Sequence, residues 1–167
     1  MCVNVSVFAY EIEEETDYVW LKEEIENVST NASKEPGILS RSAIAFDRNS
    51  NKVIWGKDEN KRTAMASTTK IMTSIIVAEN SNLDDIVTIS AKAAGTGGSR
   101  LGLKKDDKIS MRDLLYGLML RSGNDAATAI ANHIGGSVEG FTKLMNEKAL
   151  QLGMKNTIFV NSSGLED

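Results

Sequence analysis

Three segments with helical periodicity follow one another almost without interruption between residues 110 and 153. The first and third each begin with a serine, Ser110 and Ser137, just ahead of apolar residues that recur at helical spacing. The segments are separated by Ser122-Gly123-Asn124 and by Gly135-Gly136. Glycines and short polar residues end helices, and serine side chains cap the next one. The pattern therefore predicts three consecutive helices with their apolar faces in a core.

A fourth helix is expected after Ala66-Ser67-Thr68-Thr69-Lys70, where an apolar run continues to about Asn80. Further upstream, Ser42–Phe46 and Lys52–Lys57 are small or apolar, and the residues between them are turn formers. This arrangement predicts a β-hairpin. Minor elements are also expected: a short strand at 86–89, a helical turn at 90–94 and an extended segment at 157–160. The fold class is α+β.

The composition is that of a soluble globular protein with one domain. The chain has 167 residues, of which 41% are hydrophobic and 25% charged, and its net charge is −4. Residues 1–35 contain nine acidic and two basic residues, and the remainder contains 14 acidic and 17 basic residues. We interpret residues 1–39 as a leader or linker and residues 40–167 as the globular part. Nothing in this balance suggests a nucleic-acid surface.

Cofactor chemistry has few candidate ligands. Cys2 is the only cysteine and His133 the only histidine, so metal clusters and disulfides are not expected. His133 is interpreted as a residue at a helix end. No stretch is long enough to span a membrane. Residues 1–10 are short and apolar, and they are interpreted as the end of an incomplete signal peptide.

The segment at Ser67 carries the first candidate for catalysis. Ser67 and Lys70 are three residues apart, so they share one face of a helix and their side chains can meet. A lysine removed from water has a lowered pKa and can accept a proton from a hydroxyl group. Taken alone, the pair is also explained by a capping serine beside a solvated lysine.

The break at Ser122-Gly123-Asn124 carries the second candidate. A polar tripeptide held between two buried helices can point two side chains into a cleft. Simple helix punctuation, with Asn124 as N-cap, is the structural alternative. Neither candidate is specific without the other.

Together, the two motifs resemble the penicillin-recognising serine acyltransferases, which share Ser-x-x-Lys, Ser-x-Asn and Lys-Thr-Gly motifs. The segment 66–73 is similar to the nucleophile segment of the D-alanyl-D-alanine carboxypeptidases, the low-molecular-weight penicillin-binding proteins. Residues 113–127 are similar to that family's second motif over their whole length, and Asn161-x-x-Gly164-Leu165 is similar to a later one. The resemblance extends from Ser42 to Leu165. It implies a β-lactamase/transpeptidase-like fold.

The resemblance also implies a role for each residue. Ser67 would attack the carbonyl between the terminal D-alanines of a peptidoglycan stem peptide and form an acyl-enzyme. Lys70 would take the Ser67 proton, and Ser122 would relay a proton to the leaving amine. Asn124 would bind the substrate amide and help orient Lys70. No cofactor and no metal are implied. β-Lactams would acylate the same serine, and the protein would be exported to the cell envelope.

The third motif departs from the family, because Lys-Thr-Gly does not occur in the sequence. In the family this tripeptide binds the substrate carboxylate on a strand beyond the matched region. We therefore expect a domain that lacks the C-terminal strands of its sheet, with any membrane contact made through a missing C-terminal region. One alternative is a catalytically incomplete remnant or binding module. A β-lactamase is less favoured, because no Glu-x-x-Leu-Asn setting follows Asn124.

Overall fold

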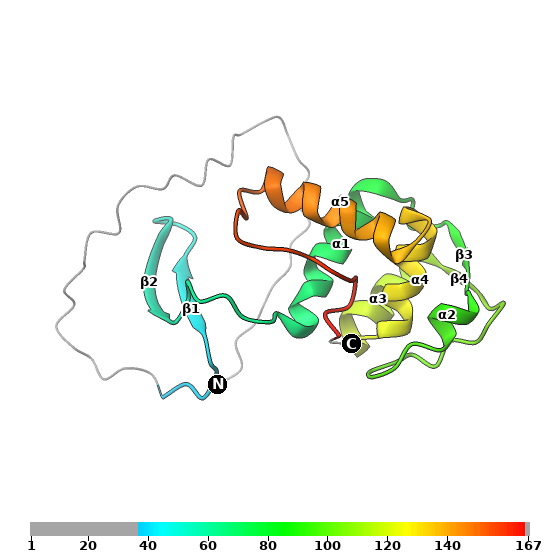
Figure 1. Cartoon of the computed structure of the whole chain (residues 1–167), viewed down its shortest axis with the longest axis horizontal. Coiled ribbons are helices and arrows are strands. Elements are labelled where there is room, and N and C mark those ends of the chain that lie inside the picture. Colours follow the sequence, from blue (N-terminus) through cyan, green and yellow to red (C-terminus); the bar gives the residue numbers. More distant parts are fainter. Residues whose placement is uncertain (1–36, 166–167) are drawn as a thin grey trace. The chain divides into compact units, whose positions relative to one another are not determined.

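The computed structural model describes residues 37–165, so most of the expected leader or linker lies outside the described residues. Within this range the chain forms a β-hairpin followed by a body of five α-helices and a second pair of strands (Figure 1). The α+β class and the combination of a hairpin with a helical subdomain are confirmed. The division at residue 39 stays a prediction.

The hairpin consists of β1 (Ala43–Asp47) and β2 (Lys52–Lys57), paired antiparallel with an irregularity after Ala45. Asp47 ends the first strand, and its carboxylate accepts a hydrogen bond from the backbone N–H of Asn49 at 3.0 Å. Such an Asx contact favours the turn that the sequence predicts. Apolar side chains on this hairpin remain exposed, namely Ile44, Phe46, Val53 and Ile54. Within the described residues the hairpin is a sheet of only two strands.

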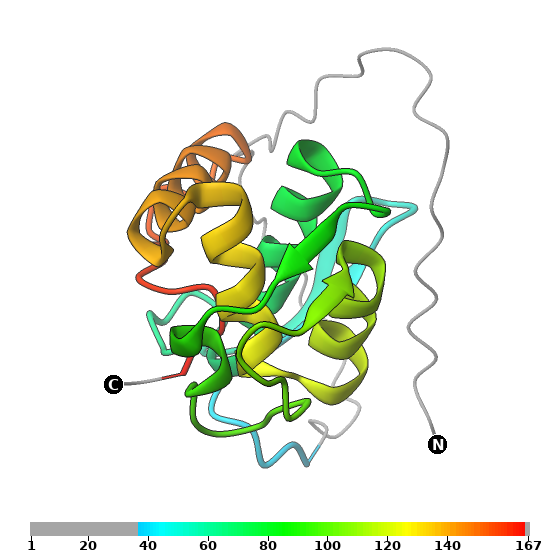
Figure 2. The same ribbon diagram turned by 90° about the vertical axis from the view of Figure 1, so that its right-hand side faces the viewer.

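The helical body is built around α4 (Asn124–Gly135), which packs against four other helices and a strand. These are α1 (Thr69–Asn80), α2 (Ala91–Ala94), α3 (Met111–Arg121), α5 (Val138–Gln151) and β3 (Ile86–Thr88). The residues of α4 from Asn124 to Ala131 are all buried, and four of them are alanines. Small side chains let neighbouring helices approach closely. Figures 1 and 2 show α4 in the middle of the body.

Two capping serines are found where the sequence predicts them. Ser110 Oγ accepts a hydrogen bond from the backbone N–H of Asp113 at 3.1 Å at the start of α3. Ser137 Oγ accepts one from Gly140 at 2.9 Å at the start of α5. Each bond satisfies a backbone donor that the helix leaves unpaired, which fixes where α3 and α5 begin.

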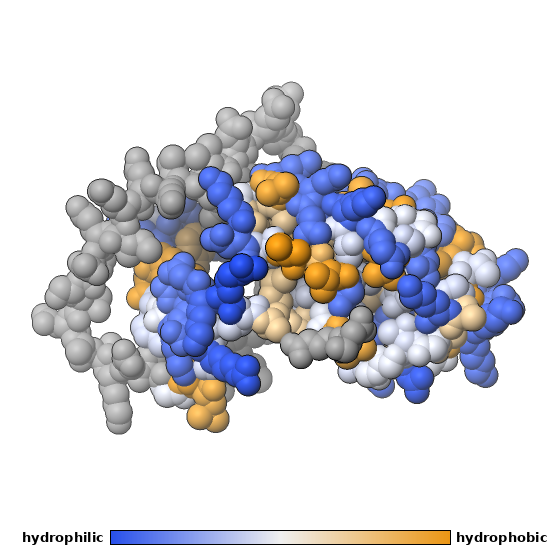
Figure 3. Space-filling view, viewed as in Figure 1, coloured by the Kyte–Doolittle hydropathy of each residue, from blue (hydrophilic) through white to orange (hydrophobic). Residues whose placement is uncertain are grey.

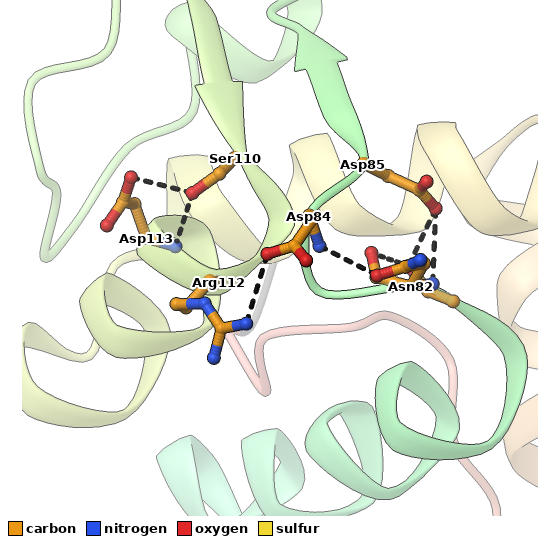
Figure 4. Close-up of polar contacts among 7 residues, drawn as sticks. Asn82, Asp84, Asp85, Ser110, Arg112 and Asp113 are labelled. Carbon is orange, nitrogen blue, oxygen red and sulfur yellow. Dashed lines mark hydrogen bonds and ion pairs between the residues drawn. The ribbon is translucent and has the colours of Figure 1, made fainter.

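A second sheet of two short strands lies in the helical body. The strand β4 (Lys108–Ser110) pairs antiparallel with β3 and leads directly into α3. Side chains reinforce this corner (Figure 4): Arg112 Nη2 lies 3.0 Å from Asp84 Oδ1, and the N–H of Asp84 donates to Asn82 Oδ1 at 3.0 Å. The strand β4 was not predicted, because Ile109 is the only apolar residue among its three, whereas β3 contains two.

The extended segment 157–160 does not join a sheet within the described part of the chain. Its Phe159 is buried, and both of its backbone polar groups pair with the side-chain amide of Asn146 at 2.8 Å. The Asn146 amide thus makes the two hydrogen bonds that a neighbouring strand would otherwise make with Phe159. On either side of Phe159, Ile158 and Val160 remain exposed, and apolar residues reach the surface over this segment (Figure 3).

Candidate active site

Ser67 lies just ahead of α1, in a single 3-10 turn, Ala66–Thr68. The sequence predicts Ser67 and Lys70 at the start of one helix, and the structure has Ser67 in this turn with α1 beginning at Thr69. The turn starts from an unusual conformation, because Ala66 has a φ of 46°, in the left-handed region that costs a residue with a Cβ atom. Ser67 and Thr68 are exposed, whereas Thr69 and Lys70 are buried. The nucleophile candidate thus stands at the surface on a tightly constrained turn.

Lys70 is the second residue of α1, and it is only 3% exposed. Its Nζ atom lies 3.3 Å from Ser67 Oγ, as the spacing of the two residues predicts. The same amine donates to Asn124 Oδ1 and to the backbone carbonyl of Ser163, both at 2.8 Å. Burial lowers the pKa of Lys70 below its ordinary value, since the charged form loses its hydration. Within residues 37–165, Lys70 forms no ion pair that would raise it again.

Ser122 is the C-cap of α3, and its side chain contacts the turn that contains Ser67. It adopts the left-handed conformation, with φ 53° and ψ 38°, at the C-cap of the helix. In this conformation Ser122 Oγ donates a hydrogen bond to Ser67 Oγ at 2.8 Å. Glycine or asparagine usually occupies such a position, and serine there pays a conformational cost. A strained residue that directs its side chain onto another reactive group is typical of functional sites.

Asn124 is the first residue of α4 and is buried. The structural alternative, in which Asn124 is the N-cap, is wrong, because Gly123 occupies the cap position. Instead, the side chain of Asn124 joins two parts of the site. Its Oδ1 accepts from Lys70, and its Nδ2 donates to the carbonyl of Gly97 at 3.0 Å.

The segment Asn161–Leu165 supplies a contact that the sequence did not predict. Its Ser163 carbonyl is one of the three partners of Lys70. The turn is shaped by Asn161, whose Oδ1 accepts from the N–H groups of Ser163 at 3.1 Å and Gly164 at 2.7 Å. It is anchored to α1 by Thr73, whose hydroxyl donates to the Ser162 carbonyl at 2.7 Å. The Asn-x-x-Gly-Leu pattern marks the turn, but nothing in it indicates a contact with Lys70.

The four candidates therefore converge on one group of contacts, although they come from three helices and the loops between them. A hydroxyl group that touches both a buried amine and a second hydroxyl can lose its proton to the amine. His133 lies in the last turn of α4, nine residues after Asn124. That spacing corresponds to about 14 Å along the helix axis, so His133 is not part of this group.

Two further observations concern metal binding and membrane spanning. In the described part of the chain, no cluster of His, Cys, Asp and Glu residues is arranged to hold a metal ion. Among residues 37–165, no helix is both long and apolar enough to cross a bilayer.

Comparison with known proteins identifies the family. The family model of the S11 peptidases, described as D-alanyl-D-alanine carboxypeptidase, matches residues 29–167. The chain belongs to this family. It is 41% identical over 133 residues to D-alanyl-D-alanine carboxypeptidase DacF of Bacillus subtilis, a match that covers 77% of this chain and 34% of the relative.

A second relative and a solved structure agree. D-alanyl-D-alanine carboxypeptidase DacC of Escherichia coli is 38% identical over 142 residues, which cover 78% of this chain and 36% of the relative. The crystal structure of D-alanyl-D-alanine carboxypeptidase DacD from Francisella tularensis superposes with a TM-score of 0.73 at 39% identity, over 80% of this chain and 34% of that one. The chain thus spans about a third of the length of these relatives.

Proposed function

We propose that this chain carries the acylation site of a serine D-alanyl-D-alanine carboxypeptidase, with Ser67 as the nucleophile. The observation that carries the proposal is the position of Ser67 Oγ, 3.3 Å from the buried amine of Lys70 and 2.8 Å from Ser122 Oγ. A serine hydroxyl is a weak nucleophile until a neighbouring base takes its proton. The family and the names of the relatives support the same reaction.

The proposed first step transfers the Ser67 proton to Lys70. This requires a neutral lysine, which burial without an ion pair favours. Ser67 Oγ then attacks the carbonyl carbon between the two terminal D-alanines. The backbone N–H of Ser67 is the proposed donor to the developing oxyanion.

The second step breaks the C–N bond and releases D-alanine. Its amine needs a proton, and we assign Ser122 to relay to it the proton that Lys70 took from Ser67, because the Ser122 hydroxyl already touches Ser67 Oγ; Lys70 is then neutral again. Asn124 would bind the amide of the acyl part while its Oδ1 holds Lys70. Water then hydrolyses the ester on Ser67, and the proton it loses returns through Lys70.

The proposed substrate is a peptidoglycan stem peptide that ends in D-Ala-D-Ala, and β-lactams would acylate the same serine. Because peptidoglycan lies outside the cytoplasmic membrane, we propose that the protein acts in the cell envelope. Contact with the membrane surface and a signal peptide stay predictions. The sequence contains no Lys-Thr-Gly, so the group that would bind the substrate carboxylate is not assigned.

The proposal is tested by measuring D-alanine released from a pentapeptide ending in D-Ala-D-Ala. The full chain should release D-alanine, and Ser67→Ala should not. Thr68→Ala, an exposed hydroxyl residue next in the chain, is the matched control and should keep activity. Equal release by wild type and Ser67→Ala, or no release by wild type, would contradict the proposal.

A further inference from the structure

Asp125 has a fully buried carboxylate that takes no part in the proposed reaction. It follows Asn124 directly at the start of α4. No ion pair involves it within residues 37–165. A buried charge is tolerated only where other groups satisfy it, so the partners of this carboxylate indicate what it is for.

All but one of its partners are backbone N–H groups of a single loop. Asp125 Oδ2 accepts from Gly102 at 2.9 Å and from Leu103 at 3.1 Å, and both carboxylate oxygens accept from Leu101, at 3.0 and 3.1 Å. Oδ1 also accepts from the next residue in the helix, Ala126, at 2.9 Å. Hydrogen bonds to an ionised acceptor are stronger than neutral ones. Asp125 therefore fastens residues 101–103 to the start of α4.

The same loop reaches Asn124 a few residues earlier. The carbonyl of Ser99 accepts from the backbone N–H of Asn124 at 2.7 Å, and the carbonyl of Gly97 accepts from its Nδ2 at 3.0 Å. A side-chain amide has one donor end and one acceptor end. With Nδ2 held by Gly97, Oδ1 must face Lys70, as it does at 2.8 Å. A turned amide would bring donor against donor at Lys70 and acceptor against acceptor at the Gly97 carbonyl.

Gly98 provides independent evidence that the loop lies in close contact with the Asn124 amide. Its φ is 74°, and a Cβ atom added there would lie 2.6 Å from Asn124 Nδ2. No room therefore exists between the loop and the amide for a side chain at this position. The orientation of Asn124 depends on the loop both through hydrogen bonds and through close contact.

We propose that Asp125 is a positioning residue for Lys70. It holds residues 101–103 in place, so that the Gly97 carbonyl keeps the Asn124 amide turned with its oxygen toward the lysine amine. Asp125 touches neither Lys70 nor Ser67 and acts only through the loop and Asn124. The inference rests on the proposed function in one respect, which is that Lys70 acts as the base.

The test follows the Asn124 side-chain amide by NMR in the ¹⁵N-labelled full chain, together with acylation by a fluorescent penicillin. Asp125→Asn replaces an acceptor by a donor facing the loop, and Gly98→Ala crowds the amide without changing any charge. In both variants the Asn124 Nδ2 protons should exchange with water about fivefold faster or more, as for the loss of one hydrogen bond. Acylation should slow by about a hundredfold, since small displacements of catalytic groups have large effects.

Met145→Ala is the control for a merely structural effect. Met145 is fully buried on α5 and makes none of these bonds, so its truncation lowers stability but should leave the Asn124 amide signals unchanged. If Asp125→Asn and Gly98→Ala fold and keep the wild-type amide signals, the inference is overturned. An amide that responds in Met145→Ala as much as in Asp125→Asn would overturn it too.

If neither Asp125→Asn nor Gly98→Ala folds, amide exchange in the wild-type chain still tests the inference. Its Asn124 Nδ2 protons should exchange far more slowly than those of Asn51, an exposed asparagine in the hairpin turn. Equal exchange at the two residues would overturn the inference. If wild type fails to react with penicillin, the proposed function is wrong, and the NMR measurements still report on the role of Asp125.

Discussion

At the scale of single residues, the surroundings of Lys70 are those required of the proposed base rather than those of a structural lysine. Its amine donates to a hydroxyl, an amide oxygen and a backbone carbonyl, all of them uncharged. A structural buried lysine is usually paired with a carboxylate, which stabilises its charge. Lys70 is buried with no carboxylate paired to its amine within residues 37–165, so its pKa is lowered.

Gly164 provides a prediction about how the site is held together. Its φ is 74°, and an added Cβ atom would lie 1.8 Å from the carbonyl oxygen of Ala66. Gly164→Ala must therefore push the turn Ala66–Thr68 and the segment 161–165 apart. Gly136 is the matched control, because its φ is 69° with nothing within 4 Å. Gly136→Ala should cost only the backbone strain, about 1–2 kcal/mol.

Gly164→Ala should destabilise the protein by about 1–3 kcal/mol more than this control does, the cost of overpacking. Urea denaturation of both variants measures the difference. Equal losses of stability in the two variants would mean that the contact between the turn and the loop is not close. Penicillin acylation should also slow in Gly164→Ala alone, because Ser67 and the Ser163 carbonyl move with the two segments.

At the scale of elements, local signals located most helices correctly. Ser110 and Ser137 cap the helices that their sequence patterns predict, and the break after α3 occurs at Ser122. Two details escaped prediction because they depend on tertiary contacts. The 3-10 turn at Ser67 follows from the left-handed Ala66, and the cap of α4 is Gly123 because the Asn124 side chain is used elsewhere.

Ser110→Ala tests the contribution of one such cap. The substitution leaves the N–H of Asp113 without its acceptor at the start of α3. We expect a loss of about 1 kcal/mol in the free energy of unfolding, measured by urea denaturation. Ser40→Ala, an exposed serine outside the helices, should change stability little. A Ser110→Ala variant as stable as Ser40→Ala would contradict the assigned cap.

At the scale of the whole molecule, the family, its two polar motifs and the approach of Asn124 to Lys70 were predictable, but the contacts made by backbone groups were not. Ser67 and Lys70 are neighbours on one helix face, so their meeting follows from spacing alone. The Ser163 carbonyl reaches Lys70 across 93 positions of the sequence, and the loop bonds of Asp125 span 22 to 24 positions. Backbone groups carry no sequence signal, so contacts of this kind are seen only in a structure.

The buried lysine also predicts how the stability of the molecule depends on pH. The folded pKa of Lys70 lies below its ordinary value of 10.5. Between the two pKa values the unfolded chain binds more protons, so the free energy of unfolding rises with pH across that window. Lys70→Met removes this term and leaves the other groups in place. The stability of wild type relative to Lys70→Met should therefore increase as pH rises toward 10.5.

Urea denaturation of the two proteins over this pH range gives the comparison. Groups that the proteins share cancel in the difference, so only Lys70 contributes to its slope. A difference that stays constant or falls with rising pH would mean that Lys70 keeps its proton in the folded state as readily as in the unfolded one.

The central claim is that Ser67 is acylated with Lys70 as its base, and the mass of the chain after reaction with benzylpenicillin tests it most directly. Wild type should gain the mass of one penicillin, on the peptide that contains Ser67. Lys70→Arg, whose guanidinium keeps its proton, should form the adduct more slowly by about a hundredfold or more. Labelling of Ser67→Ala, an adduct at another residue, or no adduct on wild type would contradict the account.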